Sequence, residues 1–279
     1  ANLNPSYYII NIDFNFFYLI LIIENKIFYN NIMRLLELFS GTHSIGKVAI
    51  KQGYEVISLD RDLPATIKED IMTWNYKIYP PKHFDVITAS PVCLWWSLLR
   101  NTWIGRICKT IHPTDVVTMA MINKDIDTYG KPMVNKIIEI IKYFQPKHWW
   151  IENPQTGKMK NYIESMYPEF NTYYDVDYCK YSDWGYQKRT RFWTNIKDYK
   201  PKVCKKDCEN LVEGKHKHRM GSSKIIIDDG KKIVVNTATL RLKYKDFENI
   251  QPKMQVPKTT KTERYRIPPK LIEEFLVLC

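Results

Sequence analysis

Residues 34–60, RLLELFSGTHSIGKVAIKQGYEVISLD, decide the fold predicted for this chain. The apolar run RLLELFS (34–40) predicts a strand that ends at a glycine turn. IGKVAIKQ (45–52) has the apolar spacing of a helix, and YEVISL (54–59) predicts a second strand, which ends at Asp60. Strand, glycine turn, helix, strand and acid in this order indicate the β-α-β unit of a doubly wound sheet.

The same alternation of strands and helices continues along the chain. FDVITAS (84–90) and HWWIEN (148–153) predict buried strands that end in polar residues, and residues 133–144 have apolar side chains at helical spacing. YYDVDYC (173–179) and RFWTN (191–195) predict two more strands. We therefore expect an α/β fold with a doubly wound, mostly parallel sheet, whose ligand crevice lies beyond the carboxyl ends of the strands.

The alternation ends near residue 196, so residues 33–196 are predicted to form the main domain. Residues 1–32 precede it as an extension of unclear role. Residues 197–263 are rich in lysine, contain short β-like segments at 225–228 and 231–236, and predict a separate small region. Residues 264–279 contain a proline pair and then a short helix, which we expect to return to the main domain.

The composition limits the possible partners. The 279-residue chain has a net charge of +12, which favours a nucleic acid or an anionic membrane as partner. The apolar run at 8–23 is shorter than a membrane-spanning helix and contains Asn11, Asp13 and Asn15, so no membrane segment is expected. Six cysteines without a paired framework indicate a reduced, intracellular chain.

The first strand runs into a turn of small residues, which lets the backbone approach a ligand closely. Asp60 follows Gly41 by 19 residues, and an acid there can accept hydrogen bonds from both ribose hydroxyls of an adenosine-type cofactor. The alternative is that Asp60 is an ordinary residue of a strand-end turn. Asp70 could similarly face an adenine amino group. The predicted cofactor-binding residues are Leu38, Phe39, Ser40, Gly41, Thr42, Asp60, Asp70, Ile71 and Pro91.

Two further strand ends carry groups that could react. Cys93, in SPVCLWWS (90–97), is expected to face the crevice, where cationic neighbours would favour its nucleophilic thiolate form. The alternative is a buried free cysteine. Glu152, in WWIENPQTGKM (149–159), is expected to reach the same edge, and partial desolvation would make its carboxyl a proton donor. The alternative is a capping or turn acid before Pro154.

A fourth segment, YQKRTRFW (186–193), presents two arginines. Arg189 and Arg191 alternate along a strand, so both side chains point to one face. Two guanidinium groups on one face suit a phosphate or a reacting base. The alternative is a solvated face of an edge strand.

These four segments, in this order, resemble the cytosine-5 DNA methyltransferase family. ELFSG is similar to the family's cofactor turn, and Pro91-x-Cys93 followed by Ser97 resembles its proline–cysteine loop. Glu152–Asn153 matches its Glu-Asn pair, and QKRTR (187–191) matches its Gln-x-Arg-x-Arg motif. The resemblance covers about residues 34–196 and is nearest to the compact phage-like and large-virus-like members.

The chain departs from the family pattern at four points. The family's cofactor turn has more glycine than SGTHS (40–44) offers. Val92 separates Pro91 from Cys93, where the family usually has proline directly before the cysteine. Pro154 replaces the valine that follows the Glu-Asn pair. The family's carboxyl-terminal Gly-Asn-Ser-Val element is not found, and RYRIPPKLIEEF (264–275) stands in its place.

The resemblance implies the class I methyltransferase fold with a small target-recognition region, S-adenosylmethionine as cofactor, and methylation of carbon 5 of cytosine. In this mechanism a flipped-out cytosine is attacked at carbon 6 by Cys93, while Glu152 protonates ring nitrogen 3. Carbon 5 takes the methyl group, a base removes its proton, and Cys93 leaves. Arg191, together with Arg189, would orient the base.

The segment after the cysteine, LLRNTWIGRICKTIH (98–112), combines basic and aromatic residues. In the family this position is a loop that closes over DNA, and such residues suit phosphate contact and filling of the base gap. The alternative is an ordinary basic surface loop. The predicted DNA-binding residues are Ser97, Arg100, Trp103, Arg106, Lys109 and Gln187.

A possible metal site lies in the lysine-rich region, where Cys204, Cys208, His216 and His218 fall within 15 residues. Zinc prefers such Cys/His sets in tetrahedral geometry. A structural zinc ion would staple a region with little core of its own. The alternative is a polar loop with incidental cysteines.

We therefore expect a monomeric DNA cytosine-5 methyltransferase. One alternative is an RNA cytosine-5 methyltransferase of the tRNA type, and another is a non-catalytic nucleic-acid-binding protein on the same fold. An amino-methyltransferase is disfavoured, because it would carry an Asp/Asn-Pro-Pro-aromatic motif where SPVC (90–93) stands.

Overall fold

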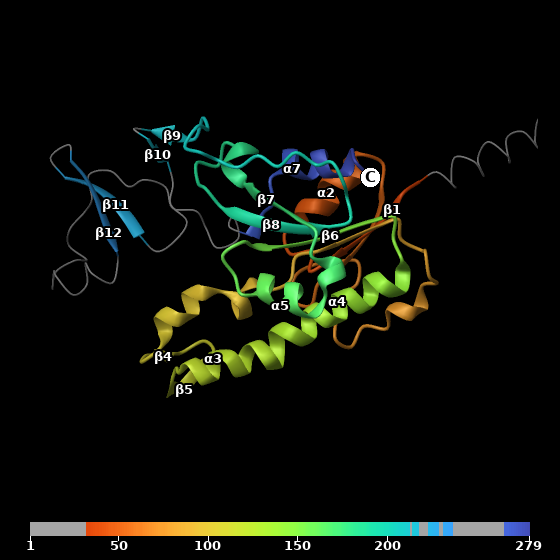
Figure 1. Ribbon diagram of the computed structural model, residues 1–279, viewed down its shortest axis with the longest axis horizontal. Helices are drawn as coiled ribbons and strands as arrows, with labels where there is room; N and C mark the ends of the chain where they lie inside the picture. Colours follow the sequence, from red (N-terminus) through yellow and green to blue (C-terminus); the bar gives the residue numbers. More distant parts are fainter. Residues whose placement is uncertain (1–31, 213, 218–222, 229–230, 237–264) are drawn as a thin grey trace, which may run out of the picture.

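The computed structural model describes residues 32–212, 214–217, 223–228, 231–236 and 265–279. Its centre is a six-stranded sheet with the order β2-β1-β3-β6-β8-β7 (Figure 1). The strands of this sheet are β1 (Arg34–Leu38), β2 (Glu55–Leu59), β3 (Val86–Ala89), β6 (His148–Pro154), β7 (Tyr173–Asp177) and β8 (Arg189–Thr194). Each lies at or within two residues of a strand predicted from the sequence.

The sheet is mixed, with its parallel part on one side. β1 pairs in parallel with β2 and β3, and β3 pairs in parallel with β6. β8 is antiparallel to both of its neighbours, β6 and β7. The predicted doubly wound, mostly parallel α/β sheet is thus confirmed for the four strands β2, β1, β3 and β6.

Helices cover both faces of the sheet (Figure 1). One face carries α2 (Ser44–Lys51) and α7 (Pro269–Leu276), and the other carries α4 (Lys131–Phe144) and α5 (Met159–Met166). The remaining helices are α3 (Met119–Asp125), η1 (Tyr76–Ile78), η2 (Cys93–Trp96), η3 (Leu98–Trp103), η4 (Ile126–Gly130), η5 (Pro168–Phe170) and η6 (Tyr178–Lys180). The remaining strands form three two-stranded sheets: β4 (Ile107–Cys108) with β5 (His112–Val116), β9 (Leu211–Val212) with β10 (Lys215–His216), and β11 (Ser223–Asp228) with β12 (Lys231–Asn236).

Adjacent residues of the central strands belong to different cores. Leu36 and Ile87 are buried with α4 and α5, whereas their neighbours Leu35 and Val86 are buried with α2 and α7. Side chains alternate between the two faces of a strand, so a strand covered on both sides is buried at every position and is mostly apolar. This explains why all four residues of β3, VITA, are buried.

The long helix begins earlier than its apolar spacing predicts. α3 and the π-helical turn η4 lead directly into α4, so helical structure starts at Met119 rather than at residue 133. Gly130 lies where this helix passes the ring of Trp96, and a Cβ atom there would lie 3.1 Å from two ring carbons. The absence of a side chain at Gly130 therefore lets the helix approach the segment that follows Cys93.

The carboxyl-terminal helix packs on the sheet beside α2. Leu271, Ile272 and Phe275 are buried against the same core as Trp150. The chain returns here over a long sequence distance, and the backbone N–H of Ile267 donates to Ser44 Oγ at 3.3 Å. The extension 1–32 lies outside the described residues, except for Ile32, and the lysine-rich region 197–263 is described only in part. Within the described part of the chain, no helix has the length and apolar character needed to cross a membrane.

A buried acid joins the first strand to the first helix. Glu37 is 2% exposed, and its Oε1 accepts a hydrogen bond from the backbone N–H of Ile45 at 3.1 Å, in the first turn of α2. A Cβ atom on Gly46 would lie 2.6 Å from Glu37 Oε2, so only glycine leaves room for this carboxyl. Burial raises the pKa of Glu37 to about 7, although the N–H groups of Gly46 and Ile45 and nearby His43 act in the opposite direction.

Replacement of this acid should change how stability depends on pH. The folded chain holds the Glu37 proton more tightly than the unfolded chain, whose pKa is near 4.5, so wild-type stability should fall as the pH rises from about 4.5 to about 7. Glu37→Gln keeps a carbonyl acceptor for Ile45 and cannot ionise. The free energy of unfolding of Glu37→Gln, measured relative to that of the wild type, should increase by about 1–3 kcal/mol from pH 5 to pH 8.

Urea unfolding at a series of pH values measures this difference. Glu164→Gln, at an exposed position of α5, is the matched control and should follow the wild-type profile. Parallel pH profiles for the wild type and Glu37→Gln would contradict the assignment.

Candidate active site at the carboxyl edge of the sheet

The four parallel strands end at the same edge of the sheet, and the residues that follow them lie together there. The turn after β1 is joined to the end of β2, because Gly41 N–H donates to Asp60 Oδ2 at 2.9 Å. The loop after β3 is joined to the end of β6, because Asn153 Nδ2 donates to the carbonyl oxygen of Pro91 at 3.0 Å. The structure therefore brings the predicted cofactor turn, the cysteine loop and the Glu-Asn pair to one edge.

The turn after β1 has an unusual backbone. Phe39 and Gly41 both have positive φ, 58° and 54°, which is the left-handed region. Ser40 between them is buried, and its Oγ has no hydrogen-bond partner within the described chain. A buried hydroxyl without a partner, in a left-handed turn at the edge of a parallel sheet, fits a polar ligand such as the predicted nucleoside cofactor.

Asp60 organises its own turn. Oδ1 accepts hydrogen bonds from the N–H groups of Asp62 at 2.9 Å and Leu63 at 2.8 Å, in addition to the bond from Gly41 on Oδ2. A carboxylate has about four acceptor positions, so about one remains for a ligand. Asp60 thus has the role of a strand-end turn residue, which was the alternative. That Asp60 also accepts hydrogen bonds from ribose hydroxyls stays a prediction.

Of the other predicted cofactor residues, some are buried and others form hydrogen bonds with nearby residues. Leu38 and Ile71 have side chains buried in the core, and Pro91 is buried as well. Asp70 accepts from the N–H of Met72 and lies 3.4 Å from the guanidinium of Arg61. The remaining residue, Thr42, shares a hydrogen bond with Ser44.

Cys93 begins the short helix η2 and is half-buried. Burial raises the pKa of its thiol, the charge of Glu152 raises it further, and the charge of Lys188 lowers it. The loop of Cys93 is fixed to the end of β6 by the bond from Asn153 to Pro91, so the predicted nucleophile lies within electrostatic range of the predicted carboxyl group.

Glu152 is 7% exposed at the end of β6. Its Oε1 accepts a hydrogen bond from the hydroxyl of Tyr178 at 3.2 Å and lies 3.5 Å from Nζ of Lys188. Burial and the charge of Glu152 raise the pKa of Tyr178 well above its ordinary value, so this hydroxyl stays protonated and acts as a donor. Neither Tyr178 nor Lys188 was predicted from the sequence as a site residue.

The side chains of Arg189 and Arg191 in β8 point to one face of the sheet, as predicted. Their partners are two acids of the neighbouring strand. Arg189 forms two hydrogen bonds to Asp177, at 3.1 and 2.6 Å, and Arg191 forms two to Asp175, at 2.7 and 2.8 Å. Both acids come from the neighbouring strand β7, and such two-point pairs hold a guanidinium in a fixed plane.

The strand register separates these arginines from the carboxyl group. Arg191 lies opposite Asn153, and Phe192 lies opposite Glu152. Residues directly opposite in an antiparallel pair point to the same face, so Glu152 and Arg191 point to different faces of the sheet. The expected convergence of both guanidinium groups on Cys93 and Glu152 is not seen, and their action on a base stays a prediction.

The segment after Cys93 differs from the prediction at Arg100. This residue is 0% exposed, forms an ion pair with Asp125, and lies between the rings of Trp95 and Trp103, 5.4 and 5.6 Å from their centroids. The prediction of Arg100 as a phosphate contact is therefore wrong, because an acid 25 residues later and two indole rings bury its charge. Asp125 also lies 2.8 Å from Nε2 of His112.

The other predicted DNA-binding residues remain near the surface. Arg106, Lys109 and Gln187 are exposed, and Trp103 is half-buried. Ser97 is half-buried, and its Oγ accepts from the N–H of Leu99 at 3.3 Å as the cap of η3. Their contact with DNA stays a prediction.

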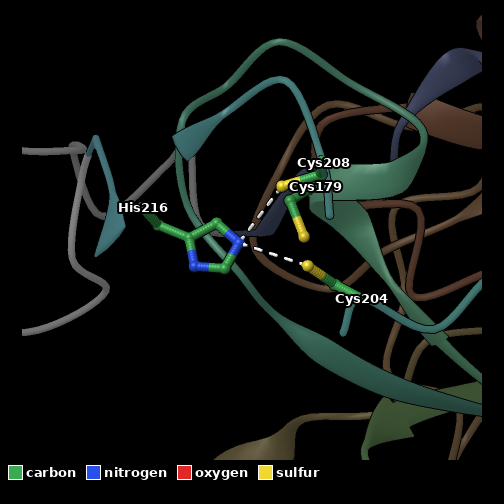
Figure 2. Close-up of side chains that lie close together, drawn as sticks. All are labelled: Cys179, Cys204, Cys208 and His216. Carbon is green, nitrogen blue, oxygen red and sulfur yellow. Dashed lines mark hydrogen bonds between the residues drawn. The ribbon is translucent and has the colours of Figure 1, made fainter. Parts of the chain in front are cut away.

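A cluster of sulfur and nitrogen atoms lies beyond β7 (Figure 2). Nε2 of His216 is 3.6 Å from Sγ of Cys204 and 3.4 Å from Sγ of Cys208. The fourth member is Cys179, which sequence reasoning missed because it lies 25 residues before Cys204. The predicted ligand His218 lies outside the described residues.

The charges near Cys93 allow a testable prediction of how the reactivity of its thiol depends on pH. Glu152→Gln removes a negative charge and should shift the alkylation of Cys93 by iodoacetamide to lower pH, whereas Lys188→Gln should shift it to higher pH. Mass spectrometry of the Cys93 peptide at a series of pH values measures both rates.

Glu164→Gln is again the control and should leave the thiol profile unchanged. If neither Glu152→Gln nor Lys188→Gln altered the profile, the three groups would not be neighbours in solution.

Comparisons with known proteins identify the family. No family model matches the chain. A curated relative, "Probable DNA (cytosine-5)-methyltransferase" of Frog virus 3 (isolate Goorha), is 37% identical over 251 residues, which are 88% of this chain and 100% of the relative.

Two solved structures are similar at a much lower level. A SAM dependent methyltransferase from Archaeoglobus fulgidus has 12% identity over 60% of this chain and 78% of that chain, with a TM-score of 0.32. An antibiotic related methyltransferase has 13% identity over 58% of this chain and 87% of that chain, with a TM-score of 0.31. These scores are too low to add to the argument.

The family resemblance seen in four sequence motifs is thus confirmed by a relative that the chain matches over that relative's whole length. This chain belongs to the DNA (cytosine-5)-methyltransferase family.

Proposed function

We propose that this protein transfers a methyl group from S-adenosylmethionine to carbon 5 of a cytosine in DNA. The observation that carries this proposal is the buried hydrogen bond from Asn153 to Pro91, which brings the loop of Cys93 to the end of the strand that carries Glu152. The name of the Frog virus 3 relative supports DNA as the substrate, and the net charge of +12 is suited to a polyanion.

The cofactor would lie against the turn after β1. S-adenosylmethionine supplies an electrophilic methyl group on its sulfonium when bound. The hydroxyl of Ser40 and the backbone of Phe39 and Gly41 would bind it, and Asp60 would accept from its ribose with the acceptor position that its own turn leaves over. Asp70 lies further along the same edge and would face the adenine.

Cys93 would act as the nucleophile on a cytosine flipped out of the helix, because carbon 6 is poorly reachable within the base stack. The thiolate forms a bond to carbon 6 while Glu152 donates a proton to ring nitrogen 3, so no charge builds up on the ring. Carbon 5 then carries the electron pair and takes the methyl group. A base removes the proton from carbon 5, the bond to Cys93 breaks, and Glu152 recovers the proton from nitrogen 3.

Lys188 would support both groups. Its ammonium lies 3.5 Å from Glu152 Oε1, and its charge favours the thiolate of Cys93 against the effect of burial. Tyr178 approaches the same oxygen of Glu152, so we expect Oε2 to face the base. Lys188, the unspecified position between Gln187 and Arg189 of the family motif, would thus be a positioning residue.

The decisive substitution is Cys93→Ser. It should lower methyl transfer to duplex DNA by about a thousandfold or more, because a serine hydroxyl is a far weaker nucleophile, while binding of the cofactor is kept. Transfer of labelled methyl groups measures the first effect, and calorimetry with S-adenosylmethionine measures the second. Cys279→Ser, at a cysteine beside α7 and outside both this site and the segment 98–112, is the control and should keep wild-type activity.

Trapping tests the covalent step separately. Duplex DNA with 5-fluorocytosine should form a stable adduct with the wild type and with Cys279→Ser but not with Cys93→Ser, because fluorine cannot leave carbon 5 as a proton does. Turnover by Cys93→Ser at the wild-type rate would refute the nucleophile. Transfer to tRNA without transfer to DNA would replace the proposed substrate by RNA.

A further inference from the structure

Four potential metal ligands from three separate parts of the chain meet next to β7 (Figure 2). Cys179 lies in η6, directly after β7, and Cys204 and Cys208 lie in the loop that follows β8. His216 lies in β10. One ligand atom from each residue falls within 4.8 Å of all the others, and Figure 2 shows the side chains turned toward one another.

We propose that Cys179, Cys204, Cys208 and His216 bind one structural zinc ion. Tetrahedral zinc, with about 2.3 Å to sulfur and about 2.05 Å to nitrogen, places neighbouring sulfur and nitrogen ligands about 3.5 Å apart. The two sulfur–nitrogen distances to His216, 3.4 and 3.6 Å, agree with this value. The six cysteines of the chain are all free thiols, so no disulfide competes for these sulfurs.

The type of site follows from the ligands. Three cysteines and one histidine fill all four tetrahedral positions, and a closed set of this kind is the structural form of a zinc site rather than the catalytic form. Three thiolates and Zn²⁺ together carry one negative charge. Lys180, which follows Cys179, lies 3.2 Å from Asp207, which directly precedes Cys208, so a cation lies beside the loop that carries the ligands.

The backbone around the site is already fixed by hydrogen bonds. Asn210 Nδ2 donates to the carbonyl oxygens of Cys179 at 2.8 Å and Ser182 at 2.7 Å, and Asn210 Oδ1 accepts from the N–H of Gly185 at 2.9 Å. The N–H of Cys204 donates to Asp177 Oδ2 at 2.8 Å. These bonds hold the loop of Cys204 and Cys208 against the end of β7, with the sulfurs in place.

The segment needs such a link, because it has little apolar burial of its own. Among residues 205–211 and 214–217, Asn210 is the one that is buried, and the others are exposed or half-buried. Small regions without a sufficient core commonly depend on metal ions or disulfides for stability. Zinc would join this segment to the central sheet.

The site also lies next to the groups assigned to catalysis. Tyr178, directly before Cys179, donates to Glu152, and Asp177 binds both Arg189 and the backbone of Cys204. If the proposed function holds, the zinc ion fixes the strand end that supports Glu152. The zinc proposal itself does not depend on that function.

Metal content tests the proposal directly. The full chain, purified without chelators, should contain about one zinc ion by elemental analysis. Replacement of zinc by Co²⁺ should give thiolate-to-cobalt charge-transfer absorption and the visible bands of tetrahedral cobalt. Absence of zinc from protein produced with zinc present, or a cobalt spectrum without thiolate absorption, would overturn the proposal, and so would a disulfide among Cys179, Cys204 and Cys208.

Variants test which residues bind the ion. Cys179→Ser and His216→Ala should lower the zinc content to less than about a tenth of the wild-type value, whereas Cys108→Ser and His218→Ala should keep it. Zinc lost from His218→Ala and kept in His216→Ala would assign the ligand to His218 and refute the set proposed from the structure. If Cys179→Ser does not fold, the cobalt spectrum of the unsubstituted chain decides. All these readouts are independent of methyl transfer, so failure of either proposal leaves the other open to its own test.

Discussion

The hydrogen bond from the Asn153 side chain to the carbonyl oxygen of Pro91 is the contact on which the arrangement of the site depends. It is buried, and it joins the end of β6 to the loop that carries Cys93. Because Asn153 follows Glu152 in the same strand, its side chain points to the opposite face. One residue therefore holds the cysteine loop in place, while the carboxyl group of its neighbour Glu152 contacts Tyr178 and Lys188 on the other face.

Charged groups inside this protein are paired across long sequence distances. Arg100 forms an ion pair with Asp125. Arg189 and Arg191 form ion pairs with Asp177 and Asp175, and Glu37 accepts a hydrogen bond from the first turn of α2. A buried charge is costly unless a partner and hydrogen bonds compensate it. The pairs therefore join η3 to α3 and β8 to β7, in addition to the apolar cores and the strand hydrogen bonds.

Much of the fold could be predicted from the sequence, because apolar runs and their spacing are local signals. The strands at 34–38, 86–89 and 148–154 were found in this way, and so was the meeting of the cysteine loop with the end of β6, since parallel strands end at one edge. Burial of Arg100 could not be predicted, because its partner Asp125 becomes a neighbour only when α3 packs beside η3. Lys188 and Cys179 were missed for the same reason, since each acquires its role from a residue far away in sequence.

The two cores on either side of the sheet have a consequence for how such chains can vary in length. Leu35 and Leu36 serve different cores, as do Val86 and Ile87. Insertion or deletion of one residue within a central strand would move every later side chain of that strand into the opposite core. Those side chains would not fit the packing of that core. Evolutionary changes of length should therefore be confined to the connections between the strands, and the spacing within β1, β3 and β6 should stay constant among related chains.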